Sequence, residues 1–385
     1  MIRWKKGMFC MIAVCMGLTP MQALAASPEF AYTEEKWASL RDNKLEFDEI
    51  AELVHEYNTT VQQNELDYQD YRGKSSLKIA EEYYDSANEV SERISYPSDD
   101  DENYASQIAR ALSSEIQVDN LITQGDNNVD DGDIKRLGYD QAEAEIIKQA
   151  QSLMITYWSR MKSLESLKEN VAQAESSYES VLIRKAAGMA VQSDEKEAEE
   201  AVTTAKASLQ SAESSLEATK KSLCVLLGWK YSDEVEIGIL PEPDLEAMEA
   251  IRVDADIETA LNNNYSLQIT ARRIANARND TVRETQQKTY ENQKETVSSN
   301  VKNAYNSLML AKASYEQAAE SLKIQEKELE AAGLRLSAGT ITRKAYESLK
   351  SGCTAARVSA ETEKLNLLNA QLTYQWAVDG LASAS

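Results

Sequence analysis

The chain has 385 residues, 27% of them charged, and a formal net charge of −23 at pH 7. Its 5 prolines, 13 glycines and 3 phenylalanines favour long helices over strands. Because so much negative charge repels nucleic acid and anionic lipid, the composition excludes both as expected partners.

The beginning of the chain has the pattern of a secretory signal peptide over residues 1–25. Three basic residues and an apolar run over residues 8–18 precede the small-residue site Ala23-Leu24-Ala25. No later apolar stretch is long enough to cross a membrane as a helix. We therefore expect an exported protein that acts outside the cytoplasm, in the cell envelope.

The first helices follow the signal peptide. An amphipathic helix is predicted over residues 47–57 and a second one over residues 60–94, which stops before Pro97 because proline disfavours helix at the residue that precedes it. The insert that follows, residues 95–133, is predicted to be irregular. It contains an acidic loop, a modest helix over residues 104–123 and a loop of Gly, Asn and Asp.

A long antiparallel hairpin comes next. One helix is predicted from residue 133 to residue 187, and Gly188 ends it, since glycine readily takes the left-handed conformation after a helix. The returning helix, residues 191–229, carries small and large residues at coiled-coil spacing: Ala198, Val202, Ala205, Leu209, Ala212, Leu216, Thr219, Leu223 and Leu226. This spacing predicts a helix laid against a neighbour along its whole length.

The pattern then begins again. After a linker over residues 230–252, with a strand-like run at 235–240, a short helix ends at Asn264 as the earlier one ended at Asn58. Apolar residues recur by sevens along the following helical region, at Val301, Leu308, Tyr315, Leu322, Leu329 and Leu336. The sequence leaves open whether residues 265–337 form one rod or turn near Asn279-Asp280.

The two halves end alike. A second tip glycine, Gly339, precedes a last helix up to Gly380, and these glycines are 41 residues apart, against 40 for Gly188 and Gly228. We predict an all-α fold of two tandem repeats of long antiparallel coiled-coil hairpins. The expected organisation is a signal peptide over 1–25, a first repeat over 26–229 with the insert at about 95–133, a linker over 230–252 and a second repeat over 253–385.

This duplicated arrangement resembles the TolC family of outer-membrane efflux channels, and the resemblance covers most of the mature chain. In that family each repeat places a long helical hairpin in a trimeric α-helical barrel. The resemblance implies a homotrimer, with a membrane-fusion (adaptor) protein and an inner-membrane transporter as partners.

In the TolC family, the hairpin tips carry the residues that dock on a partner protein. Family members have a Val-Gly-Leu type turn that docks on a periplasmic adaptor, and an aspartate near the tunnel entrance six residues after the glycine. The turns here are Ala187-Gly188-Met189 and Ala338-Gly339-Thr340. Asp194 follows Gly188 by six residues, whereas Ala345 has that place after Gly339. The resemblance implies adaptor docking at both turns and a tunnel-entrance role for Asp194.

Family members also insert β-strands between the second and third helices of each repeat to form the outer-membrane pore. A transmembrane strand needs roughly 9 to 11 residues of alternating apolar character. The corresponding windows, residues 96–133 and 279–296, are instead rich in acidic and amide side chains. We expect the TolC-like α-barrel part without a transmembrane β-barrel, and a chain that does not span an outer membrane by itself.

No set of residues predicts catalysis, a metal site or a cofactor. His55 is the only histidine and lies on an amphipathic helix, where packing is its expected role. The acidic loop over residues 125–133 lacks the glycine and glutamate that a calcium loop needs at fixed places. Cys224 and Cys353 fall on apolar seams of equivalent helices, so we expect buried thiols without a disulfide.

Two functions fit these features. The first is a non-catalytic, TolC-like efflux or export component, a helical conduit or adaptor-docking element of the cell envelope. The second is an exported coiled-coil scaffold that derives from the TolC fold and has lost transport. The duplicated hairpins with two glycine tips favour the first, and the polar windows in place of strands favour the second.

Overall fold

The computed structural model describes residues 31–98 and 103–384. Within these ranges the chain is almost entirely helical, so the predicted all-α class is confirmed. The predicted signal peptide, residues 1–25, lies outside the described residues. None of the described helices combines the length and the apolar character needed to cross a bilayer.

The first half of the chain contains one long hairpin and several shorter elements before it. They are α1 (Glu34–Leu40), β1 (Lys44–Leu45), the 3₁₀ turn η2 (Phe47–Glu49), α2 (Ile50–Tyr57), α3 (Thr59–Tyr71), α4 (Ser76–Glu92), α5 (Tyr104–Asn127), α6 (Gly132–Ala186) and α7 (Gln192–Leu226).

The second half repeats the order of α2, α3, α6 and α7 without the α4–α5 pair. It contains β2 (Glu236–Ile237), α8 (Leu245–Glu249), α9 (Val253–Asn263), α10 (Tyr265–Asn276), α11 (Asp280–Ser337), α12 (Arg343–Trp376) and the π-helical turn η3 (Ala377–Leu381). The strand-like run predicted in the linker contains β2, which pairs in parallel with β1. At about 1.5 Å per residue, the 55 residues of α6 and the 58 of α11 each extend over roughly 80 to 90 Å.

The helix predicted over residues 60–94 is broken, and the insert is more regular than expected. Gly73 has a positive φ of +74° between α3 and α4, and the Ser75 hydroxyl caps α4 by accepting a hydrogen bond from the Lys78 N–H (3.2 Å). The helix expected over residues 104–123 extends to Asn127, so it fills most of the insert and packs against α4. The sequence missed this hairpin because its buried seam is mostly alanine.

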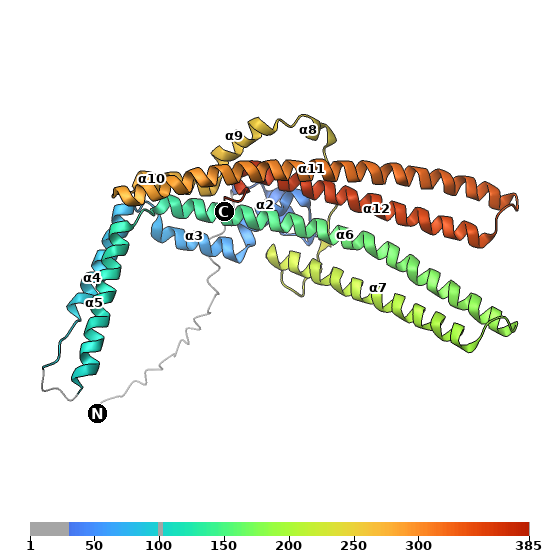
Figure 1. The fold of residues 1–385 in the computed structure, drawn as a ribbon, viewed down its shortest axis with the longest axis horizontal. Helices are drawn as coiled ribbons and strands as arrows, with labels where there is room; N and C mark the ends of the chain where they lie inside the picture. The colour runs from blue at the N-terminus through green and yellow to red at the C-terminus, as the bar shows by residue number, and fades with distance from the viewer. Residues whose placement is uncertain (1–30, 99–102, 385) are drawn as a thin grey trace, which may run out of the picture.

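The open question about residues 265–337 is settled by a turn. α10 ends at Asn276, Ala277 is extended, and the Asn279 side chain starts α11 by accepting a hydrogen bond from the Val282 N–H (2.8 Å). In Figure 1, α10 runs toward one end of the molecule and α11 returns beside it. The region is therefore a short helix and a long helix in a hairpin.

The four long helices form one layer in the order α7, α6, α12, α11 (Figure 1). Each hairpin has its own core near its base. The first core surrounds Met154 and Leu223, and the second surrounds Leu267, Leu308 and Leu367, all of them 1% exposed or less. Toward the tips the helices of each hairpin meet only along the narrow coiled-coil seam.

The predicted seam residues face the partner helix. On α7, the small and large seam residues from Ala198 to Leu216 are partly buried, while most of the residues between them are exposed. Cys224 and Cys353 are buried and free, as expected, and burial raises the pKa of the Cys224 thiol. A raised pKa keeps this thiol protonated and unreactive.

Candidate functional site

The two hairpin tips have the same backbone geometry. Gly188 (φ +74°) and Gly339 (φ +70°) follow the last turns of α6 and α11 in the left-handed conformation. The Met189 N–H donates to the Arg184 carbonyl (2.7 Å), and the Thr340 N–H donates to the carbonyl of the arginine at the same offset, Arg335 (2.9 Å). These are Schellman turns, which satisfy helix-end carbonyls and reverse the chain within a few residues.

Nothing crowds either tip glycine. A Cβ atom at Gly188 or Gly339 would meet no heavy atom within 4 Å, so only the backbone conformation demands glycine there. The turns predicted as Ala187-Gly188-Met189 and Ala338-Gly339-Thr340 therefore present their side chains to solvent.

Apolar side chains surround the first tip and recur at the second. Met189 is 69% exposed, Val191 is 61% exposed and Ile183 is 70% exposed. Leu334 is 69% exposed and precedes Gly339 by five residues, as Ile183 precedes Gly188. Sequence reasoning did not single out Ile183, Val191 or Leu334, although the common offset from the tip glycine is visible in the sequence. Exposed apolar groups at a rod end are a feature of contact surfaces.

Asp194 takes part in starting α7. Its carboxylate accepts a hydrogen bond from the Val191 N–H (2.9 Å), and its own N–H donates to the Val191 carbonyl (3.1 Å). A carboxylate is stabilised there by the free N–H groups at a helix N-terminus. The second tip uses Thr342 instead, whose hydroxyl accepts from the Ala345 N–H (3.2 Å). The two tips thus share a turn and differ in charge.

A polar groove of about 610 Å³ lies between α6 of the first hairpin and α12 of the second. Its lining is mostly hydroxyl and amide side chains, among them Ser166, Asn170, Gln173 and Ser177 on α6 and Ser348, Ser351 and Thr354 on α12. One direct contact crosses it, from the Ser351 hydroxyl to the Glu169 carboxylate (3.1 Å). With so little apolar contact, this stretch adds little to the cohesion of the two hairpins.

Each hairpin is closed at its base by an asparagine. Asn264 caps α10 by accepting from the Leu267 N–H (3.1 Å), and its amide donates to the carbonyls of Gly380 (3.0 Å) and Ala382 (2.8 Å). In the first repeat, the Asn58 side chain accepts from the Thr60 N–H (2.9 Å) and donates to the Leu226 carbonyl (2.8 Å). The sequence marked these asparagines only as the ends of short helices. In the structure their side chains join the start of each repeat to its end.

The closing glycines lie directly against these turns. A Cβ at Gly228 would be 2.4 Å from the Tyr57 Cβ, and a Cβ at Gly380 would be 2.6 Å from the Asn263 carbonyl oxygen. Both glycines also have positive φ. Here glycine is required by close approach as well as by conformation.

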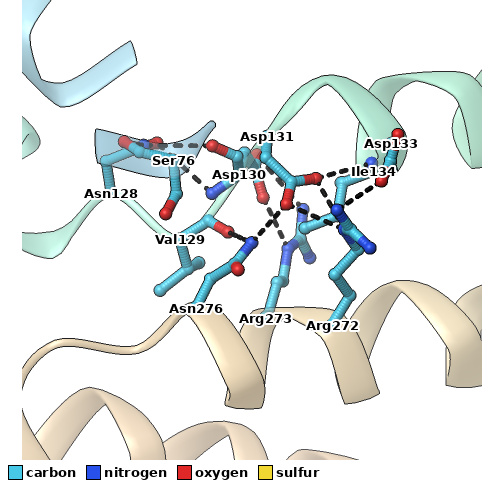
Figure 2. Close-up of polar contacts among 10 residues, drawn as sticks. All are labelled: Ser76, Asn128, Val129, Asp130, Asp131, Asp133, Ile134, Arg272, Arg273 and Asn276. Carbon is cyan, nitrogen blue, oxygen red and sulfur yellow. Dashed lines mark hydrogen bonds and ion pairs between the residues drawn. The ribbon is translucent and has the colours of Figure 1, made fainter. Parts of the chain in front are cut away.

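A cluster of charged residues joins the two repeats at the end opposite the tips (Figure 2). Arg273 donates to Asp130 and Arg272 to Asp131, each with a shortest distance of 2.8 Å. Asn276 donates to Asp131 (2.7 Å) and to the Val129 carbonyl (2.9 Å). Three donors from little more than one turn of α10 therefore hold the acidic residues that precede α6. The sequence analysis missed this cluster because its partners are about 140 residues apart.

Asp131 is the most enclosed member of the cluster, with a side chain that is 5% exposed. Burial acts to raise its pKa, but hydrogen bonds from Asn276 and from the Ile134 N–H, together with the Arg272 guanidinium, outweigh burial and hold the pKa of the carboxyl below its usual value. In the loop considered for calcium, Asp130 and Asp131 thus serve as arginine partners. The part of the chain that the structure describes contains no group of three or more His, Cys, Asp or Glu residues that could hold a metal ion.

His55 forms an ion pair that links α2 to α6. Its Nδ1 lies 2.9 Å from a Glu143 carboxylate oxygen, and this hydrogen bond raises the pKa of His55 above the usual 6.5. The pair is partly exposed and lies on the outside of the first core. Its geometry is that of a structural contact between helices.

The comparisons with known proteins identify the fold. No protein-family model matches the sequence, and no curated protein matches it either. Solved structures do match it. CusC, from a study of transmembrane channel formation, has a TM-score of 0.53 at 11% identity, over 91% of this chain and 95% of that one.

Two further structures give the same result. The Campylobacter jejuni CmeC outer membrane channel has a TM-score of 0.52 at 10% identity, over 94% of this chain and 93% of that one. A membrane protein from Pseudomonas aeruginosa has a TM-score of 0.52 at 13% identity, over 86% and 93%. At such low identity these TM-scores establish a common fold alone, and that fold is the one found in outer membrane channels such as CmeC.

Proposed function

We propose that this protein is a TolC-like efflux or export component, a protomer of a non-catalytic helical conduit in the cell envelope. The observation that carries the proposal is the open layer α7, α6, α12, α11, which has two unlike edges. A layer with unlike edges associates head to tail, and such association forms a closed ring when the rotation between protomers closes. The fold shared with outer membrane channels supports this assembly.

The α11 edge has the apolar residues that such an interface needs. Leu310 is 70% exposed and Ile324 is 55% exposed, and they lie two heptads apart on the face of α11 opposite the buried Val301 and Leu308. In the proposed ring this face packs against α7 of the next protomer. Three protomers, the number that the family resemblance implies, would close a barrel of twelve long helices.

The tips define the proposed docking end of the conduit. Ile183, Met189 and Leu334 offer apolar contacts around Gly188 and Gly339 to a membrane-anchored adaptor protein, which would connect the conduit to an inner-membrane transporter. Asp194, at the start of α7, would contribute negative charge near the tunnel entrance. Export by the predicted signal peptide would deliver the chain to this location.

A second candidate is an exported scaffold that retains the hairpins without transport. The polar groove between α6 and α12 favours it, because two hairpins that meet mainly through polar side chains toward their tips can separate there to take a partner. The scaffold predicts a monomer or a dimer, and the conduit predicts a closed trimer.

The oligomeric state of the mature protein, residues 26–385, tests the proposal. Sedimentation equilibrium should give the mass of a trimer, and electron microscopy should show a ring. Leu310→Glu should shift the protein to monomers, because it puts a charge into the interface. Lys323→Glu, which puts a negative charge on an exposed site about 140° around α11 from Leu310, should leave the trimer intact. A wild-type protein that stays monomeric at all concentrations would rule out the conduit.

A further inference from the structure

A groove of about 480 Å³ lies between α6 and α7, in the half of the first hairpin that is nearer the tip. Leu167 on α6 and Ala201 and Ala205 on α7 make part of its lining apolar. Apart from two glutamates, the α7 residues that line it are small, so a side chain from another molecule can approach this helix closely. The groove therefore fits a large apolar side chain from a neighbouring helix.

The opposite edge of the layer has such a side chain at the same distance from the tip. Ile324 on α11 is 55% exposed and precedes Gly339 by 15 residues. Ala201 and Thr204, which line the groove, follow Gly188 by 13 and 16 residues. At about 1.5 Å per residue, all three lie roughly 20 to 24 Å from their tips, which are at the same end of the molecule (Figure 1).

Ile324 and the groove are also turned toward the same face of the layer. Ala201 and Thr204 each precede a seam residue of α7 by one position, and Ile324 likewise precedes the partly buried Gln325 of α11. One position is a rotation of about 100° around a helix. Because α7 runs away from its tip and α11 toward its tip, on opposite edges of the layer, equal rotations from the two seams point to one face. A ring that curves toward this face brings Ile324 and the groove together.

Charge supports the same alignment. The groove is acidic at the end nearer the tip, where Glu200 lies 12 residues after its tip glycine. On α11, the exposed Lys327 lies 12 residues before its tip glycine and about one turn from Ile324. Opposite charges are therefore level with each other when Ile324 meets the groove. Glu328, beside Lys327, opposes this attraction, so we expect the charges to fix the register of the contact and to add little affinity.

We infer that Ile324 of one protomer inserts into the α6–α7 groove of the next protomer, between Ala201 and Thr204. This inference rests on the proposed ring, in which rotational symmetry brings residues at one height together, and it adds the register of the ring's interface near the tips. The contact is head to tail, so every protomer offers one groove and one Ile324. It ties the second hairpin of each protomer to the first hairpin of its neighbour.

Cysteine crosslinking of the mature chain, residues 26–385, tests the inference. A chain with both Ile324→Cys and Thr204→Cys should form disulfide-linked dimers and trimers on mild oxidation, because the Cα atoms of a disulfide lie within about 7 Å of each other. The two cysteines cannot link within one chain, since α7 and α11 lie on opposite edges of the layer. Each single variant, and the unmodified chain with its two buried thiols, gives the background.

Ser211→Cys in place of Thr204→Cys is the matched control. Ser211 is exposed and also precedes a seam residue of α7, but it lies about 10 Å farther from the tip than Thr204. Paired with Ile324→Cys, it should crosslink roughly tenfold less. Equal crosslinking at Thr204 and Ser211, or none at either, would overturn the inference.

A charge exchange tests the register without cysteines. Lys327→Glu should raise the dissociation constant of the trimer roughly fivefold, because it places like charges level with each other at every interface. Adding Glu200→Lys to the same chain should bring the constant back to within about twofold of wild type, since the pair is restored in reverse. Sedimentation equilibrium measures all three proteins. A double variant weaker than either single variant would contradict the alignment of Lys327 with Glu200.

The crosslinking result and the oligomeric state separate this inference from the proposed function. A trimer that fails to crosslink between Ile324→Cys and Thr204→Cys would refute the register and retain the conduit. Crosslinked chains that grow without closing into a ring would support the contact of Ile324 with the groove and refute the conduit. A wild-type protein that stays monomeric would refute both.

Discussion

At the scale of single residues, Asn264 and Asn58 each cap a neighbouring helix and also form a hydrogen bond to a residue far away in the sequence. The oxygen of each amide caps the helix that begins beside it, and the nitrogen binds carbonyls at the end of the same repeat. Asn264 is 1% exposed and Asn58 is 6% exposed, so these bonds are not replaced by water when the side chain is removed.

We predict that Asn264→Ala lowers the free energy of unfolding by about 3 kcal/mol, since it removes a helix cap and leaves two carbonyls without a donor. Asn58→Ala should lower the free energy of unfolding by somewhat less, because the Asn58 side-chain nitrogen binds one carbonyl and that of Asn264 binds two. Asn262→Ala, at an exposed site two residues earlier, should change the value by less than about 0.5 kcal/mol. Urea unfolding curves measure all three. Equal effects at Asn262 and Asn264 would contradict the prediction.

Because of the His55–Glu143 pair, we expect the stability of the protein to depend on pH. Because its hydrogen bond to Glu143 raises the pKa of His55 in the folded state, the pair stabilises the protein fully below the usual value of 6.5, and this contribution is lost as pH rises through the folded pKa. His55→Gln should therefore be less stable than wild type at low pH and equal to it at high pH. The difference should stay below about 1 kcal/mol, since the pair is partly exposed.

The NMR titration of the only histidine measures this pKa directly. Glu143→Gln should lower the pKa of His55, because it removes the negative partner. An unchanged midpoint in Glu143→Gln would show that the pair does not form in solution.

At the scale of helices and turns, glycine has two different tasks. At the tips, Gly188 and Gly339 are needed only for the left-handed conformation, since the space around them is open. At the bases, Gly228 and Gly380 also allow the backbone of one element to touch another. In the sequence all four glycines look the same, because each follows a helix. Only the packing around them shows which ones are also required by a close contact.

We predict different costs for alanine at these glycines. Gly339→Ala should lower the free energy of unfolding by about 1 to 2 kcal/mol, the cost of a left-handed alanine. Gly380→Ala should lower it by about 3 kcal/mol or more, because the new methyl also collides with the Asn263 backbone. Chemical denaturation of the two variants under the same conditions measures the difference. A smaller cost at Gly380 would refute the close contact at the base.

At the scale of the whole molecule, the two repeats are joined more firmly at one end than at the other. The Asp130, Asp131, Arg272 and Arg273 cluster holds them together near α10 (Figure 2), whereas a polar groove separates α6 from α12 toward the tips. The two hairpins are therefore held together less firmly at their tips than at their α10 end.

Breaking the cluster should loosen one end of the molecule. We predict that Arg272→Ala lowers the free energy of unfolding by about 1 to 3 kcal/mol, since it leaves the enclosed Asp131 without its main ionic partner. Arg93→Ala, which removes an ion pair 78% exposed at the arginine, should change it by less than about 0.5 kcal/mol. A double-mutant cycle with Asp131→Asn should give a coupling near 1 kcal/mol. A coupling of zero would mean that the two residues act independently.

The sequence by itself determined the long helices, the two tips and the duplication. These features depend on signals between residues close in the chain: heptads along α7 and α11, and glycines able to take positive φ after a helix. It also predicted buried thiols at Cys224 and Cys353, because both lie on seam positions.

Only the tertiary structure decided how the helices are placed. It showed the turn after Asn276, the hairpin of α4 and α5, the contact of α6 with α12 and the pairing of Asp131 with Arg272. The physical reason is distance along the chain. Periodicity states which face of a helix is apolar, but not which of several similar faces will cover it, and an ion pair between residues about 140 positions apart leaves no local pattern.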